Sequence, residues 1–298
     1  MDSHMVRASE LLRKIAQLQI HTKKLLRGAS AGSYLTRRLG TGSEFDQLRE
    51  YQDGDNVRSI DWKSSARSNK LIVRSYREDR NRTIVLLIDT SPSGLFSSGN
   101  QLKLTAIQDL AVMMGFAAEQ ARDRFGAIFF HQTVEKVIPL GAGKSHSVLL
   151  AQAAFEAVST QDKQISAEET SLSAAFARTM EQFPKNALVV LISDCVSSDY
   201  QTVMATVAQQ HELVVLRVYD AIEREVPADL LIQFQDPETG ATVNGTDPHA
   251  LAALRTFTQK WYADQDLFFK KLGVDCADIN VNAPYDTVLI QFFAQRGF

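Results

Sequence analysis

The sequence is poor in residues that crosslink a protein or anchor it in a membrane. Its 298 residues include two cysteines, Cys195 and Cys276, too few for a disulfide framework or a thiolate zinc site, which fits a reducing cytoplasm. No stretch approaches the roughly 18–20 consecutive apolar residues of a membrane-spanning helix. Basic residues interrupt every apolar run near the N-terminus, which argues against a secretory signal. We therefore expect a cytoplasmic protein without a membrane span.

Charge is nearly balanced overall but unevenly distributed. Residues 1–82 carry an excess of seven positive charges and residues 83–298 an excess of ten negative ones, which gives the formal net charge of −3. The cations of the first part are interleaved with acids, as in Arg77-Glu78-Asp79-Arg80. This pattern favours a salt-linked surface over nucleic-acid binding, and we expect no nucleic-acid partner.

The hydrophobic pattern predicts an α/β protein. Residues 5–27 have the spacing of an amphipathic helix, and residues 33–82 indicate an irregular β-rich lobe. From Thr83, apolar runs typical of buried strands alternate with helical patterns. The predicted strands are 83–88, 125–130, 135–140, 187–193 and 213–218, and the predicted helices between them are 102–120, 145–158, 171–182 and 199–210. Such alternation predicts a doubly wound, mostly parallel sheet.

We predict three parts in the chain. Residues 5–82 form the N-terminal helix and the lobe, and residues 83–222 form the alternating domain. Residues 223–298 add a hairpin with a turn at Gly240 and helices over 248–272 and 285–296, which pack on that domain.

The pentapeptide Asp89-Thr90-Ser91-Pro92-Ser93 has the clearest chemistry. It follows a predicted buried strand, so one carboxylate and two hydroxyls can point to one spot beyond the sheet, where ligands of such folds bind. These hard oxygen ligands suit Mg²⁺ or Mn²⁺. Asp194 also ends a predicted strand, and Thr170 precedes a predicted helix, so both are further candidates. The alternative is an Asp/Ser turn that caps the next helix.

These residues resemble, in kind and order, the metal-ion-dependent adhesion site of von Willebrand factor A domains. The resemblance implies that Asp89, Ser91, Ser93, Thr170 and Asp194 hold Mg²⁺, Mn²⁺ or Ca²⁺, with Asp194 acting through water. It also implies an open coordination position that a partner's carboxylate fills, so that the ion is held most firmly with the partner bound. Cys195 departs from the family pattern, in which a small residue, often glycine, follows the aspartate.

A second resemblance runs from about Gly32 to the C-terminus. The segment from Gly54 to Arg67 is similar to the signature of the bacterial family catalogued as domain of unknown function 58, which precedes an A domain. The resemblance implies a non-enzymatic scaffold that works with a MoxR-type AAA+ ATPase, or a client protein, in a chaperone-like assembly. Within the signature, a salt-bridged joint and a partner-facing surface are both open for Arg58, Asp61, Trp62 and Arg67.

The main alternative is a metal-dependent hydrolase or phosphatase that uses the same strand-end carboxylates. Against it, the only further acid at a predicted strand end is Asp220, which has no recognisable catalytic context. The string Gly141-Ala142-Gly143-Lys144-Ser145 imitates a phosphate-binding loop, but Ile138 stands where the Walker pattern needs a glycine. We therefore expect no catalytic residues and no enzyme activity.

Overall fold

A buried central strand organises the fold. In a computed structural model of the protein, β3 (Thr83–Asp89) is covered on both faces because the residues from Ile84 to Ile88 are all apolar. The structure describes residues 13, 15–22, 44–51, 60–68, 70–77, 82–99, 101–161, 171–197, 200–226, 233–235, 242–244 and 248–296.

The strand order places β3 inside a six-stranded sheet, β10-β7-β6-β3-β4-β5. All neighbouring pairs are parallel except β4 with β5 at one edge. The other strands are β4 (Arg124–Phe130), β5 (Val134–Gly141), β6 (Leu188–Ser193), β7 (Glu212–Tyr219) and β10 (Asp275–Asn280). Because β3, β6 and β7 are parallel neighbours, the residues that follow them meet along the edge of the sheet that is formed by the carboxyl ends of its parallel strands.

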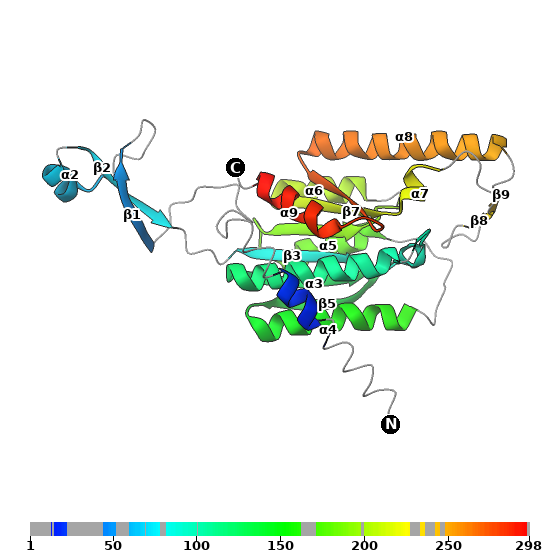
Figure 1. The fold of residues 1–298 in the computed structure, drawn as a ribbon, viewed down its shortest axis with the longest axis horizontal. Coiled ribbons are helices and arrows are strands. Elements are labelled where there is room, and N and C mark those ends of the chain that lie inside the picture. The colour runs from blue at the N-terminus through cyan, green and yellow to red at the C-terminus, as the bar shows by residue number, and fades with distance from the viewer. Residues whose placement is uncertain are drawn as a thin grey trace, which may run out of the picture.

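Helices cover both faces of this sheet (Figure 1). Ile84, Leu86 and Ile88 of β3 pack in one core with α3 (Lys103–Ala121), α4 (Lys144–Gln161) and α9 (Tyr285–Arg296). Val85 and Leu87 point to the opposite core with α5 (Leu172–Gln182), α6 (Gln201–Gln210) and α8 (Pro248–Leu272). This alternation along β3 confirms the predicted doubly wound, mostly parallel fold.

The N-terminal part contributes a helical segment and a small lobe. Ile15, in the helical residues 15–22, is buried in the core on the α3 side. The lobe pairs β1 (Glu44–Glu50) with β2 (Ile72–Arg77) as antiparallel strands beside α2 (Trp62–Ser68). The predicted helix and β-rich lobe are therefore present within the described residues.

The pattern of apolar residues missed the helix α2 within the lobe and three elements around the six-stranded sheet. Strand β10 has the sequence Asp-Cys-Ala-Asp-Ile-Asn, which lacks a continuous apolar run because the strand lies at the sheet edge. The two short helices η2 (Pro92–Leu95) and α7 (Ala221–Arg224) follow β3 and β7 directly and are too short for a helical period. The predicted hairpin is present as β8 (Gln233–Gln235) and β9 (Thr242–Asn244), and its turn at Gly240 lies outside the described residues.

Among the residues that the structure describes, no helix has the length and apolar character needed to cross a membrane.

Candidate functional site

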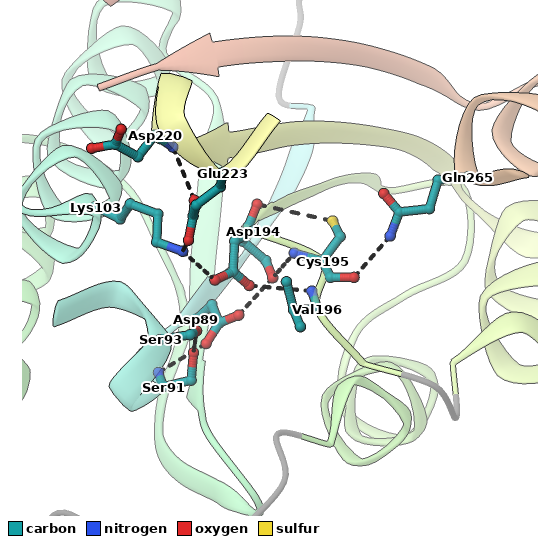
Figure 2. A network of polar contacts seen from close by, with 11 residues as sticks. Asp89, Ser91, Ser93, Lys103, Asp194, Cys195, Val196, Asp220, Glu223 and Gln265 are labelled. Atoms are coloured by element: carbon teal, nitrogen blue, oxygen red, sulfur yellow. Dashed lines mark hydrogen bonds and ion pairs between the residues drawn. The ribbon is translucent and has the colours of Figure 1, made fainter. Parts of the chain in front are cut away.

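Four of the five predicted ligands come together at the carboxyl ends of β3 and β6 (Figure 2). Asp89 is the last residue of β3, and the chain turns into η2 after Ser91. The backbone N–H of Ser91 donates to Oδ1 of Asp89 at 2.9 Å, and the hydroxyls of Ser91 and Ser93 lie 2.8 Å apart. The Asp/Ser turn itself is therefore present and gathers the oxygens, but Ser91, at the N-cap of η2, makes no side-chain capping bond to that helix.

The fifth predicted ligand, Thr170, lies outside the described residues. The next residue, Ser171, donates its backbone N–H to the carbonyl oxygen of His131, just beyond β4, at 2.8 Å. Its hydroxyl caps α5 by accepting from the N–H of Ala174 at 3.3 Å. The start of α5 therefore lies at the same edge of the sheet as Asp89.

Asp89 is a buried carboxylate that the protein stabilises incompletely. The side chain of Ser193 donates to its Oδ2 at 2.5 Å, and only 1% of the residue is exposed. Burial, together with the negative charge of Asp194, raises the pKa of Asp89 from 3.8 to about 7 in spite of the hydrogen bonds from Ser193 and Ser91. A bound cation would lower the free-energy cost of keeping the Asp89 carboxylate ionised.

Asp194 already has a cation beside it. The Nζ of Lys103, the first residue of α3, lies 2.9 Å from Oδ2 of Asp194 and 2.7 Å from Oε1 of Glu223. Burial alone would raise the pKa of Asp194, but the Lys103 charge and several hydrogen bonds hold it below its usual range. One of these bonds is from the N–H of Val196 to Oδ1 at 3.2 Å, so both oxygens of Asp194 have partners.

Glu223 is held in place by the short helix α7. Its side chain accepts from the backbone N–H of Asp220 at 3.0 Å, while Asp220 accepts from the N–H of Ile222 at 3.1 Å, which forms a capping box. The Asp220 carboxylate also accepts from the N–H and the hydroxyl of Ser98 and from the side-chain amide of Asn282. The bonds from Ser98 and Asn282 join their loops to the start of α7.

The donor set matches a hard divalent ion in its chemistry. Asp89 and Asp194 offer carboxylate oxygens and Ser91 and Ser93 offer hydroxyl oxygens, which are the ligands that Mg²⁺ and Mn²⁺ prefer. Within the described part of the chain, no group of three or more His, Cys, Asp and Glu side chains is placed to hold a metal. Half of this donor set is serine, so the site differs in kind from such a cluster.

Cys195 has the backbone of the glycine that it replaces in the A-domain pattern. Its φ angle is 59°, in the left-handed region that favours glycine. Its side chain is fully buried, and its carbonyl oxygen accepts from the side-chain amide of Gln265 on α8 at 2.9 Å. The departure at this position therefore leaves the backbone path of the loop after Asp194 in place.

The signature residues have different surroundings. Asp61 is buried and caps α2 by accepting from the N–H groups of Lys63 and Ser64 at 3.1 and 3.2 Å. Trp62 is 66% exposed, and Arg67 is also exposed. Arg58 lies outside the described residues. Asp61 has a structural contact, whereas Trp62 and Arg67 are accessible to a partner.

Sequence reasoning missed Lys103, Glu223 and Ser193 as members of the site. A lysine in the first turn of a helix is disfavoured by the positive end of the helix dipole, so Lys103 in that position signals a nearby buried anion. The spacing Asp220-Ala221-Ile222-Glu223 is that of a capping box, which could have revealed α7. Ser193 gave no signal, because a serine at the end of an apolar strand is common.

Comparison with known proteins gives the family. A family model described as "Protein of unknown function DUF58" matches residues 47–265, most of the chain. The chain belongs to the DUF58 family. Among its relatives, the uncharacterized protein Rv1480 of Mycobacterium tuberculosis is 25% identical over 232 residues, covering 78% of this chain and 72% of that protein. The uncharacterized protein YeaD of Bacillus subtilis is 37% identical over 49 residues, which cover 16% of this chain and 12% of that protein.

Solved structures similar to this DUF58 chain include A-type domains. The conserved hypothetical protein BatB from Bacteroides thetaiotaomicron has a TM-score of 0.46 and 13% identity, and the match covers 72% of this chain and 98% of that one. The SpRpn10 VWA domain has a TM-score of 0.40 and 8% identity, over 71% of this chain and 94% of that one. Similarities of this size do not bear on function, and the fold class rests on the strand order described above.

Proposed function

We propose that this DUF58 protein is a non-enzymatic scaffold that binds a partner protein through a divalent cation held at the carboxyl end of β3. The observation that supports it is the convergence of Asp89, Ser91, Ser93 and Asp194 at one edge of the sheet. Asp89 and the two serine hydroxyls would hold the ion, Mg²⁺ or alternatively Mn²⁺ or Ca²⁺. Bound there, the ion would supply a directional attraction for a carboxylate of the partner.

The residues around the site do the remaining work. Ser193 orients Asp89 through its hydrogen bond to Oδ2, and the N–H of Ser91 fixes the other oxygen. Asp194 is engaged with Lys103, which supports the prediction that it acts on the ion through water. The site is nearly closed, with Ser93 7% and Asp194 6% exposed, so the partner's group would approach a small opening.

The hydrolase or phosphatase alternative finds less support in these contacts. Both oxygens of Asp89 accept hydrogen bonds, which lowers the reactivity of this carboxylate as a nucleophile. Asp220, the further acid that such an enzyme could use, accepts hydrogen bonds from Ser98, Ile222 and Asn282. A group held in this way is a poor general acid or base, because its hydrogen bonds favour the ionised form.

The partner that we propose is a MoxR-type AAA+ ATPase or its client, as the family resemblance implies. Exposed Trp62 and Arg67 in the lobe are candidates for a second contact with the same partner. We also propose a cytoplasmic setting, in which both free cysteines would remain reduced.

A pull-down from a lysate of the source bacterium tests the proposal. The bait is the whole chain in Mg²⁺ or in EDTA, compared with Asp89→Ala and with Asp264→Asn as a control at an exposed aspartate on α8. We expect capture of an AAA+ ATPase by the wild type and the control in Mg²⁺, and its loss in EDTA and with Asp89→Ala. Capture that neither treatment changes would contradict a metal-dependent interface at Asp89.

A further inference from the structure

Lys103 is a buried ammonium group in direct contact with a proposed ligand. Its side chain is 1% exposed, and its Nζ bridges Oδ2 of Asp194 at 2.9 Å and Oε1 of Glu223 at 2.7 Å (Figure 2). We propose that Lys103 is a tethered cation that shares Asp194 with the divalent ion and so sets the affinity and the charge preference of the site. This inference rests on the proposed function.

The position of Lys103 shows that the pairing is specific. Lysines at helix surfaces ordinarily extend to water, and an ammonium in the first turn of α3 also meets the positive end of the helix dipole. Burial against that preference is tolerated only when anions compensate the charge. Asp194 and Glu223 are those anions, and they are 91 and 120 residues away in the sequence. The lysine is therefore held at this place by the site itself.

The charges of the cluster select a divalent ion. Asp89, Asp194 and Glu223 contribute three negative charges when ionised, and Lys103 contributes one positive charge. The two negative charges that remain are those that one divalent ion neutralises. Without the lysine, three negative charges would remain, which favours a trivalent ion more strongly than a divalent one.

Glu223 acts as a positioning residue for Lys103. Its carboxylate is fixed by the backbone N–H of Asp220, so it draws the ammonium partly away from Asp194. If Glu223 lost its charge, Lys103 would pair with Asp194 alone and compete more strongly with the ion. Substitutions at 103 and 223 should therefore change metal affinity in opposite directions.

Isothermal titration calorimetry of the whole chain with Mn²⁺, and separately with Tb³⁺, tests this. We expect Lys103→Met to bind Mn²⁺ at least about tenfold more tightly than the wild type, and to gain more for Tb³⁺ than for Mn²⁺. Glu223→Gln should bind Mn²⁺ more weakly. Lys144→Met is the matched control, because Lys144 is an exposed lysine at the start of α4, on the opposite edge of the sheet.

The double variant Lys103→Met with Glu223→Gln separates net charge from contact. It keeps the net charge of the wild-type cluster but removes the lysine that pairs with Asp194. It also leaves fewer unpaired charges than Lys103→Met, so it serves as the test if that single variant does not fold. We expect it to bind Mn²⁺ more tightly than the wild type. Unchanged or weaker Mn²⁺ binding by folded variants that lack Lys103 would overturn the inference. Failure of both the single and the double variant to fold would also overturn it, since Lys103 would then serve stability alone.

The wild-type titration separates this inference from the proposed function. Equal Mn²⁺ affinity of the wild type and folded Lys103→Met would overturn the inference and leave the proposed function standing. Binding by Lys103→Met alone would overturn the inference, because the lysine would then exclude the ion instead of sharing Asp194 with it, and would also refute a metal-dependent function of the wild type. Binding by no folded variant would refute both.

Discussion

Replacing Asp89 by asparagine should stabilise the metal-free protein, although Asp89 lies at the centre of the proposed site. The carboxylate is buried and repelled by Asp194, and only hydrogen bonds from Ser91 and Ser193 oppose these effects. Asparagine has nearly the same size and can keep the bond from the Ser91 N–H. Its amide can donate to the Ser193 hydroxyl, whose oxygen also accepts from the N–H of Cys195. The substitution thus removes a charge without opening a cavity.

The size of the effect follows from the pKa of Asp89, which is raised from 3.8 to about 7. A rise of this size corresponds to a cost of about 4 kcal/mol for the ionised form at high pH. We expect a net gain of about 2–4 kcal/mol for Asp89→Asn at about pH 8 in EDTA. Because the folded state keeps this proton where the unfolded state loses it, the wild type loses stability relative to the variant as pH rises from 3.8 to about 7.

Urea unfolding followed by circular dichroism measures this difference at about pH 4 and about pH 8. The control is Asp264→Asn, at an exposed aspartate on α8, which should change stability little at either pH. In Mg²⁺ at more than about 1,000 times its dissociation constant the order should reverse, because the bound ion then stabilises the wild type by more than about 4.1 kcal/mol. An Asp89→Asn variant that is less stable than the wild type in EDTA at high pH would refute the reasoning.

Three further predictions concern the loops and the sheet edge. Cys195→Gly should be about 1 kcal/mol more stable than Cys195→Ala in urea unfolding, because only glycine relaxes the left-handed backbone, whose φ is 59°; a more stable alanine variant would exclude strain there. Asp220→Asn should cost about 1–3 kcal/mol at neutral pH through hydrogen bonds lost to Ser98 and Ile222. Although burial alone would raise the pKa of Asp220, these bonds lower it, so this cost should shrink in acid as pH falls below 3.8; a pH-independent cost would contradict it. Arg217→Met should cost about 1–3 kcal/mol by thermal and urea unfolding, since Asp278 loses a charged hydrogen-bond partner but keeps Arg224; a neutral effect would mean that the pair contributes nothing.

The sequence determined the fold class and the edge at which the site lies. The strand periods from Thr83 onward reflect burial on both faces, a local property of each segment, and β3, β6 and β7 lie where they were predicted. Because parallel strands present their carboxyl ends together, Asp89 and Asp194 could be placed near each other without coordinates. The family resemblance and the family match point to the same class of protein.

Other features of the structure could not be predicted from the local sequence pattern. Strand β10 lacks a continuous apolar run because it lies at a sheet edge, and only its pairing with β7 reveals it. Asp61 belongs to a segment whose opposite charges suggested a salt-bridged joint or a partner surface, and its capping of α2 could not be predicted from those charges. The metal, the partner and the absence of enzyme activity stay predictions.

Only the tertiary structure decided what surrounds the predicted ligands. Lys103 meets Asp194 and Glu223 because α3 starts beside the loops that follow β6 and β7, and this depends on strand order. No local period fixes strand order, since any two buried parallel strands have similar sequences. The sequence therefore determined which oxygens gather at the edge of the sheet, and the fold decided that a buried lysine shares one of them.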